Sequence, residues 1–542
     1  MRWLGTLPVL VIAALVLALA MLVPAAHAAA VGAPAIAVAF LESSVGFLVL
    51  GGLAALATSA PPSTARSRGV LGTLLGVYAG LPLICAIPFA AVMHDTGLFN
   101  AWWEMLSCLT TTGATLYAAD LVPPSLHLWR ATVGWLGGLF ILIAAIALMA
   151  PLRVGGFEVM DGGSGTDERF ERLSGSRADL RPGRDYAAHL GDPALRLIRW
   201  GAAITPLYAA LTGALWFGLM ITGDTALNAL IRAMGTLSTS GIGLTAQPIG
   251  ASGGMAAEAL VAVFMLAALT RRTWPGGGEL QLSHRLRHDP ELRIAAALIL
   301  LVTLVLFLRP FLGAFDSDVQ PMGPPEPAAA SLAGRLARAA AAAWGSLFTA
   351  LSFLSTTGWT SMHWDGARAW AGLNAPGLML AGLAIMGGGI ATTAGGVKLL
   401  RVYALALHAR RELHKIVHPA SIAGGGPITR RLRGSGAYLA FIFFMVFALS
   451  IAMTISLVSL RPVAFETATI LSVAALTNTG QLAHAIPLMP AYEGSAGIAG
   501  SPWQGWAGLA VSTKAVLAGA MVAGRLEMLA ILALLSPGAW RR

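Results

Sequence analysis

The sequence predicts an all-α polytopic membrane protein in which four repeats surround one central pore in a pseudo-four-fold arrangement. Each repeat consists of a membrane helix, a pore loop and a second membrane helix, and one or two extra helices precede the first repeat. Three observations predict this class: an apolar composition, basic residues concentrated in alternate loops, and a short glycine motif that occurs four times. Hydrophobic residues make up 56% of the 542 residues and charged residues only 11%, whereas a soluble domain carries about 25% charged residues.

The formal net charge of +10 reports membrane topology rather than nucleic-acid binding. Lys and Arg gather in alternate loops, while Asp316 and Asp318 make one of the intervening loops acidic. Basic loops stay in the cytoplasm by the positive-inside rule, so the pattern predicts a multi-pass protein with no nucleic-acid partner. The basic stretches are residues 66–68, 153–199, 271–293, 401–433 and 541–542.

Four segments are variants of one motif, in which hydroxyl-bearing residues lead to a glycine between two long apolar runs. The motif recurs about every 120 residues, and such a period indicates one supersecondary unit repeated along the chain. Each motif follows an apolar segment of about 10 to 15 residues, which is too short to cross a bilayer and fits a re-entrant helix. Irregular backbone at that depth is tolerated where it is packed in protein or lines a water-filled path, and four such elements favour the path. The segments are Thr110–Ala114, Ser238–Ile242, Ser355–Trp359 and Leu476–Gly480.

The apolar runs and the charged stretches between them divide the chain into units. Each repeat begins and ends with a run long enough to span the bilayer. The stretch after repeat 1 is dense in charged residues and reads as a cytoplasmic linker, and the second helix of repeat 3 is broken by glycines. The predicted units are residues 1–60 for the N-terminal helices, 69–150 for repeat 1, 151–194 for the linker, 195–270 for repeat 2, 271–291 for a cytoplasmic loop, 292–408 for repeat 3, 409–436 for a second cytoplasmic loop and 437–535 for repeat 4.

The N-terminal segment has two interpretations. Arg2, the apolar run 7–23 and the sequence Ala26-His27-Ala28 resemble a signal peptide with its cleavage site. The alternative is a retained first membrane helix. Both interpretations place the C-terminal end of the next span on the cytoplasmic side, so the distribution of Lys and Arg does not decide between them. We favour the retained helix.

The four motifs have the composition of a cation filter. A cation that leaves water needs oxygen ligands in place of its hydration shell, and rings of backbone carbonyls assisted by small hydroxyls provide them. Glycine permits the left-handed backbone that such loops require. A single Thr-Gly pair would more often cap an ordinary membrane helix. Four such pairs, each between two spans, favour filter loops instead. The predicted filter residues are Thr112, Gly113, Ser240, Gly241, Thr357, Gly358, Thr479 and Gly480.

On these motifs the chain resembles the Trk/Ktr/HKT-type potassium transporters, which fold as four membrane–pore-loop–membrane repeats around one pore. The resemblance covers residues 69–535; the first three loops match well, and the fourth, Asn478-Thr479-Gly480-Gln481, matches more loosely. It implies potassium uptake across the bacterial inner membrane, with the eight filter residues binding the transported potassium ion and no cofactor. It also implies a homodimer embedded in the lipid bilayer and a cytoplasmic nucleotide-binding ring protein as regulator, docked on loops 271–293 and 401–433.

Two further stretches resemble the family. Residues 387–398 are too rich in Gly and Thr for a regular helix, and the resemblance makes them an intramembrane gate loop below the filter; the alternative is a helix-packing face of small residues. The resemblance also places Arg525, inside the last span, in the pore beneath the filter, where the alternative is an arginine that snorkels to the cytoplasmic surface. The predicted gate residues are Gly387, Gly388, Gly389, Thr392, Thr393, Gly395, Gly396, Lys398 and Arg525.

Several functional questions stay open at this level. Glu104 and Arg232 each lie nine residues before a motif glycine, and one hypothesis is that they pair or oppose each other across the outer pore.

Sodium or mixed cation transport, and the ion-translocating subunit of an ATP-driven potassium pump, are alternative functions within this architecture. A secondary solute transporter built from inverted repeats would have two halves of opposite membrane orientation. Here each repeat is predicted to begin and end on the cytoplasmic side. The chain has no phosphate-binding loop and no catalytic carboxylate pair, so we predict that it is not an enzyme.

Overall fold

The structure of this protein is a computed structural model, and it describes residues 7–58, 72–150, 193–245, 247–275, 289–313, 332–371, 377–418, 434–486 and 505–527. Within these ranges every regular element is a helix. Eight helical segments there are long and apolar enough to cross a membrane: Val9–Ala30, Pro34–Thr58, Gly72–Val92, Pro124–Met149, Leu195–Ile221, Gly250–Ala268, Pro290–Leu308 and Gly436–Val458. Residues 151–192 of the predicted linker, and residues 276–288 and 419–433 of the two predicted cytoplasmic loops, lie outside the described residues.

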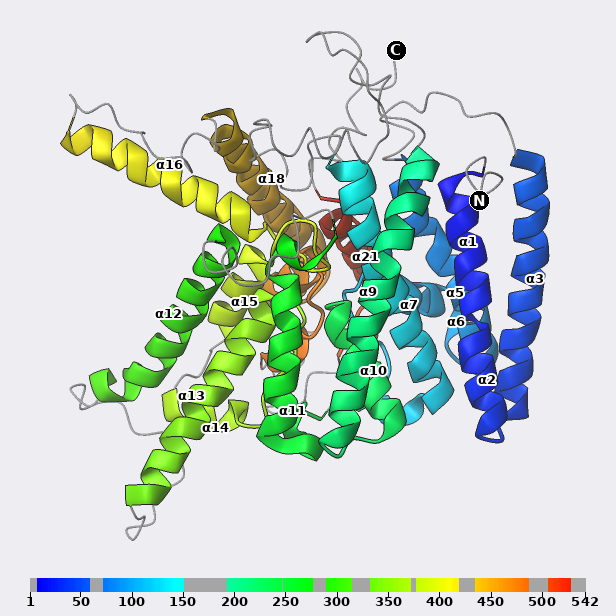
Figure 1. The fold of residues 1–542 in the computed structure, drawn as a ribbon, viewed down its shortest axis with the longest axis horizontal. Coiled ribbons are helices and arrows are strands. Elements are labelled where there is room, and N and C mark those ends of the chain that lie inside the picture. The colour runs from blue at the N-terminus through cyan, green and yellow to red at the C-terminus, as the bar shows by residue number, and fades with distance from the viewer. Residues whose placement is uncertain are drawn as a thin grey trace.

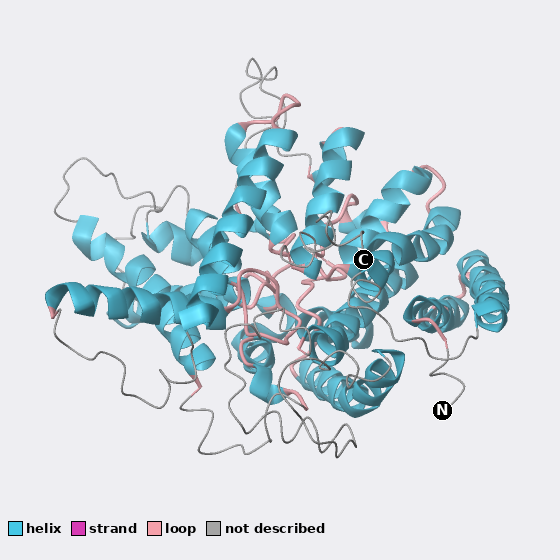
Figure 2. Cartoon of the chain, turned by 90° about the horizontal axis from the view of Figure 1, so that it is seen from above, coloured by secondary structure: helices cyan, strands magenta, loops and turns pink. Residues whose placement is uncertain are grey.

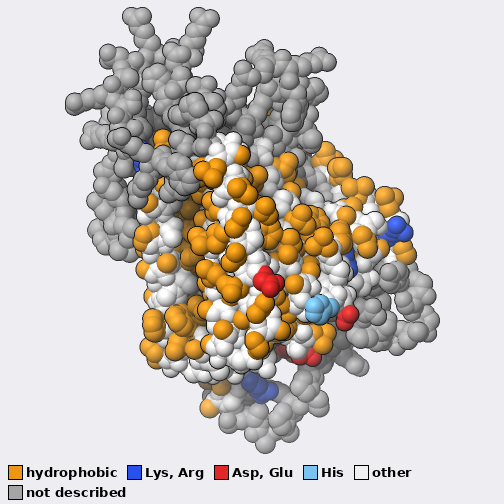
Figure 3. Space-filling model, turned by 90° about the vertical axis from the view of Figure 1, so that its right-hand side faces the viewer, with side chains coloured by type: hydrophobic (Ala, Val, Ile, Leu, Met, Phe, Trp, Pro, Cys, Tyr) orange, Lys and Arg blue, Asp and Glu red, His pale blue; other side chains and the backbone are white. Residues whose placement is uncertain are grey.

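The N-terminal helices form a hairpin at one edge of the molecule (Figure 1). Helices α1 (Val9–Ala20) and α2 (Leu22–Ala30) make one span, which packs against α3 (Pro34–Thr58). The end of α2 is joined to repeat 1, because His27 Nδ1 lies 2.9 Å from the hydroxyl of Ser125. The face on this side of the molecule is covered with apolar side chains (Figure 3), as expected of a surface in contact with lipid.

Each repeat supplies a first helix, a re-entrant helix and a second helix. In repeat 1 these are α5 (Leu81–Val92) with the π-helical turn η2 (Gly76–Gly80), α6 (Gly97–Leu109), and α7 (Pro124–Ala144) with the π-helical turn η4 (Ala145–Met149). In repeat 2 they are α9 (Pro193–Ile221), α10 (Ala226–Leu237) and α11 (Gly250–Met265). In repeat 3 they are α12 (Pro290–Gly313), α13 (Leu332–Leu354), and the pair α15 (Gly377–Met386) and α16 (Leu399–Val417). In repeat 4 they are α18 (Gly434–Val458), α19 (Phe465–Leu476) and α21 (Val511–Leu526).

The irregularities of these helices have local causes in the sequence. Pro82 has no N–H to donate, and the turn before it is a π-helix. Gly254 interrupts α11 with φ 60° and ψ −155°. Between Met386 and Leu399 the backbone is not helical, which separates α15 from α16. The short connecting helices are η3 (Ala119–Leu121), η6 (Leu266–Ala268), η7 (Arg271–Thr273), α14 (Trp364–Ala371), α20 (Leu482–Ala485) and η10 (Trp506–Gly508).

The re-entrant helices close a circle. Each packs against the helices of its own repeat and also against the second helix of the preceding repeat: α10 on α7, α13 on α11, α19 on α15, and α6 on α21. The last of these contacts joins repeat 1 to repeat 4. Seen from above, the helices surround a centre in which the loops gather (Figure 2). Helix α16 leaves this bundle sideways (Figure 1).

Candidate ion-conducting site

The centre of the bundle contains four five-residue loops, one after each re-entrant helix. We number the positions of each loop from 1 to 5, so that the motif glycine is position 4. The loops are loop 1 (Thr110–Ala114), loop 2 (Ser238–Ile242), loop 3 (Ser355–Trp359) and loop 4 (Thr477–Gln481).

The first three positions have the same conformation in all four loops. The residue at position 2 has a positive φ, which is uncommon for residues other than glycine: 57° at Thr111, 54° at Thr239, 58° at Thr356 and 54° at Asn478. The hydroxyls at positions 1 and 3 are hydrogen-bonded to each other, at 2.9 Å for Thr110–Thr112, Ser238–Ser240 and Ser355–Thr357 and at 3.2 Å for Thr477–Thr479. These hydroxyls therefore brace the loops internally.

Position 4 separates the fourth loop from the others. Gly113, Gly241 and Gly358 have φ of 71°, 60° and 81°, values that a β-carbon would strain. Their N–H groups donate to a carbonyl of the re-entrant helix in the same repeat, each at 3.2 Å. Gly480 has no positive φ, and its N–H donates to the carbonyl of Thr112 in loop 1 at 2.7 Å.

The loops touch one another in a closed ring. A β-carbon added to Gly113 would overlap the carbonyl oxygen of Ser240, and one added to Gly241 would overlap the carbonyl of Thr357. A β-carbon on Gly358 would meet loop 4, and one on Gly480 would lie 2.7 Å from the carbonyl of Thr112. The order of contact is therefore loop 1 to 2 to 3 to 4 and back to 1. All eight predicted filter residues lie in this ring.

Residues 387–398, which we call the gate loop after the role predicted for them from the sequence, fold beneath this ring. The hydroxyl of Thr239 in loop 2 donates to the carbonyl of Thr393 at 2.8 Å, and the N–H of Gly395 donates to the hydroxyl of Thr356 in loop 3 at 2.8 Å. A β-carbon on Gly395 would overlap the carbonyl of Thr477 in loop 4. The gate loop thus contacts three of the four loops on one side.

The glycines of the gate loop allow it to fold back on itself and against its neighbours. The N–H of Gly389 and the hydroxyl of Thr392 both donate to the carbonyl of Ala268, at 2.9 and 3.0 Å. Gly387 and Gly396 have φ of 71° and 77°, and a β-carbon on Gly388 would lie 2.5 Å from Ala268 O. The ring, the gate loop and the end of repeat 2 are therefore in direct contact.

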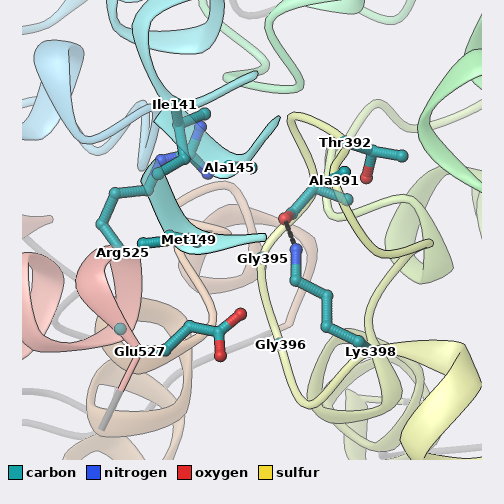
Figure 4. A pocket seen from close by; sticks show the side chains of 12 residues that line it. Ile141, Ala145, Met149, Ala391, Thr392, Gly395, Gly396, Lys398, Arg525 and Glu527 are labelled. Atoms are coloured by element: carbon teal, nitrogen blue, oxygen red, sulfur yellow. Dashed lines mark hydrogen bonds between the residues drawn. The ribbon is translucent and has the colours of Figure 1, made fainter. Parts of the chain in front are cut away.

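Charged groups surround a small cavity beside the gate loop (Figure 4). Arg525, which is 4% exposed, donates from Nη1 to the carbonyl of Thr393 at 2.7 Å. Lys398 donates to the carbonyl of Ala394 from the opposite side. Below them Glu527 accepts from Arg401 at 2.6 Å. The Arg525 guanidinium consequently lies buried beside residues 387–398.

Sequence reasoning missed one link to the gate loop, through Glu291 at the start of α12. Its Oε1 accepts the N–H of Ile390 at 2.9 Å, and its Oε2 accepts the N–H of Arg271 at 3.3 Å. One buried carboxylate therefore joins the gate loop to the segment that follows repeat 2.

Potassium uptake proteins of bacteria are similar to this chain in sequence, and a solved potassium transporter is similar to it in fold. No family model matches the chain. It is 25% identical over 480 residues to the Trk system potassium uptake protein TrkH of Salmonella typhimurium, covering 86% of this chain and 84% of the relative. It is 26% identical over 561 aligned residues to the Trk system potassium uptake protein TrkI of Halomonas elongata, covering 100% of this chain and 98% of the relative. The chain is therefore similar over most of its length to the TrkH and TrkI potassium uptake proteins.

A solved structure supports the fold. The crystal structure of the potassium transporter TrkH from Vibrio parahaemolyticus superimposes with a TM-score of 0.72, covers 100% of both chains and shares 21% of residues. The predicted fold class, an all-helical multi-span membrane protein, is confirmed. Because members of the TrkH family are transporters and not enzymes, the prediction that the chain is not an enzyme is also confirmed.

The hypothesis that Glu104 and Arg232 face each other across the pore is wrong. Glu104 Oε1 pairs with Arg130 Nε on α7 at 2.7 Å, and its Oε2 accepts the N–H of Leu116 at 2.9 Å. Arg232 pairs with Asp224 at 2.7 Å and also donates to nearby carbonyls. Both charges are buried in the wall around the ring, so neither sets the charge at its mouth.

A second carboxylate, Glu258 on α11, anchors the chain after loop 3. It is fully buried and accepts three hydrogen bonds: from Trp344 Nε1 at 2.8 Å, from the hydroxyl of Ser361 at 2.8 Å and from the N–H of Met362 at 2.6 Å. The only signal in the sequence was a lone acid in an apolar span. It joins repeat 2 to the pore loop of repeat 3.

Replacing Glu258 with alanine is expected to destabilise the protein strongly. The buried Ser361 hydroxyl and two partly buried donors would lose their acceptor, and since an unsatisfied buried group costs about 1–3 kcal/mol, we expect a loss of at least that size. The thermal unfolding midpoint of the detergent-purified protein should fall clearly for Glu258→Ala and less for Glu258→Gln, which keeps one acceptor oxygen. Glu42→Ala, on the exposed face of α3, is the control. Equal midpoints for Glu258→Ala and Glu42→Ala would contradict the anchoring role.

Proposed function

We propose that this protein is a potassium-uptake pore in which the ring of four loops replaces the hydration shell of the ion. The observation that carries the proposal is the closed ring of loops with the gate loop folded beneath it. Because the hydroxyls at positions 1 and 3 bind each other, the backbone carbonyls at positions 3 and 4 are the ligands that we assign to the ion. The names of the TrkH and TrkI relatives support potassium as the cargo.

In this proposal the gate loop blocks the path below the ring. Its hydrogen bonds to Thr239 and Thr356 hold it there, and Arg525 adds a positive charge that opposes a cation and a donor that holds the carbonyl of Thr393. An ion can pass only when the loop leaves its place under loops 2, 3 and 4. Opening is therefore a movement of the segment between α15 and α16.

Regulation would act through the elements attached to the gate loop. We propose a homodimer with a cytoplasmic nucleotide-binding ring protein docked on the basic loops 271–293 and 401–433. Helix α16 follows the loop directly and carries the exposed Arg410 and Arg411, while Glu291 joins the loop to Arg271. A partner that moves either segment would move the gate.

Flux measurements test this proposal. The purified protein in liposomes should carry potassium down its gradient without ATP, and its expression should restore growth of a potassium-uptake-deficient bacterium at low potassium. Because each loop has a single glycine motif, we expect weaker discrimination against sodium than in filters with several consecutive sites. Sodium flux without potassium flux would favour the sodium alternative. Flux that requires separate ATP-driven subunits would favour the pump alternative, and absence of cation flux would overturn the proposal.

A further inference from the structure

Gln481, at position 5 of loop 4, reaches across the ring. Its side-chain Nε2 donates to the carbonyl of Gly113 in loop 1 at 3.2 Å and to the carbonyl of Gly241 in loop 2 at 2.8 Å. A β-carbon on Gly358 in loop 3 would lie 2.6 Å from Gln481 Cβ. The residue thus touches all three other loops, including loop 2, which stands opposite loop 4 in the order of contact. A side chain with these contacts lies over the axis of the ring.

The other residues at position 5 have different places. Trp359 donates from Nε1 to the hydroxyl of Thr236 at 3.1 Å, behind loop 2. Ile242 packs beside Gly134 on α7, and Ala114 is fully buried. Gln481 alone among the four position-5 residues is polar, and it is the one directed at the carbonyls.

Loop 4 also differs in the groups that it presents to the ring. The N–H of Gly480 donates to the carbonyl of Thr112, and the Gln481 amide donates to two more carbonyls. Three oxygens of loops 1 and 2 are therefore bound by donors of loop 4. Each carbonyl oxygen has two lone pairs and an N–H donor occupies one of them, so these three oxygens bind an ion more weakly while loop 4 keeps this arrangement.

We propose that Gln481 is a lid that closes the ring at the end away from the gate loop. This inference rests on the proposed filter role of the ring. The side chain is partly exposed, so it can swing outward without disturbing the protein core. An arriving cation must displace the amide from Gly113 and Gly241 before it enters, and the lid therefore sets both the entry rate and the apparent affinity. Loop 4 contributes this lid in place of a fourth equivalent set of carbonyls.

The test compares Gln481→Ala and Gln481→Met with wild type in liposomes, by potassium flux at several external concentrations and by the potassium-to-sodium permeability ratio. Both variants lose the two hydrogen bonds, which correspond to about tenfold in an equilibrium constant. We expect flux at low potassium to rise several-fold, up to about tenfold, with a lower half-saturating concentration. Gln481→Met keeps the length of the side chain, so it can be measured in place of the alanine variant if that variant does not fold. Gln247→Ala, which changes an exposed glutamine outside the ring, is the control and should behave as wild type.

The outcomes separate this inference from the proposed function. If wild type and Gln247→Ala carry potassium and both Gln481 variants match them in flux, half-saturating concentration and permeability ratio, the lid is refuted while the pore stands. Reduced flux in both variants would mean that Gln481 supports the ring and does not close it, which also refutes the lid. Absence of cation flux in every protein, including one with Arg525 replaced by alanine, would refute the pore itself.

Discussion

Replacing Gly113 with serine is expected to reduce cation flux about a hundredfold or more, equivalent to about 2.7 kcal/mol in the barrier. The new β-carbon would overlap the carbonyl oxygen of Ser240, so loops 1 and 2 would have to separate. The φ of 71° would also become strained, at a cost of about 1–2 kcal/mol. The change thus moves the oxygens that we assign to the ion. Potassium flux in liposomes, with the amount of folded protein measured by size-exclusion chromatography, checks it.

Gly97 provides a closely matched control. It lies at the start of α6, its φ is also 71°, and a β-carbon there would meet nothing within 4 Å. Gly97→Ser therefore introduces the same backbone strain in the same repeat without touching the ring, and its flux should stay within about twofold of wild type. If Gly113→Ser and Gly97→Ser conduct equally well, the assignment of the ring as the filter is wrong.

The sequence was sufficient to predict the parts of the site that depend on local pattern. Hydroxyl residues before a glycine, placed after a short apolar segment, identified all four loops, because the repeat supplies four copies of one signal. The excess of glycine in residues 387–398 predicted irregular backbone in the same way. In both cases the residues that produce the geometry are neighbours in the chain.

Features that depend on distant partners could not be predicted in this way. Glu104 and Arg232 share a position relative to their glycines, but Arg130 and Asp224 decide where their charges lie. The acceptors of the Gln481 amide are 368 and 240 residues away in the chain. Loop 4 has the expected hydroxyls, yet its glycine takes another conformation because its N–H finds an acceptor in loop 1. Symmetry in the sequence therefore overstated the symmetry of the ring.

Replacing Arg525 with alanine is expected to raise potassium flux about tenfold. The guanidinium is buried beside the gate loop and donates to the carbonyl of Thr393, and hydrogen bonds from charged groups are worth about 1.5–3 kcal/mol. Its loss weakens the attachment of the gate loop and removes a positive charge from the path that we assign to the ion. Arg525→Lys keeps the charge and should stay closer to wild type, so the pair separates electrostatic from steric effects. A gate that depends on this arginine must leak without it, because the remaining contacts of the gate loop are hydrogen bonds that place no positive charge beside the carbonyl of Thr393. Unchanged flux in the alanine variant would instead mean that Arg525 only stabilises the end of α21, and that the barrier below the ring is formed by other residues.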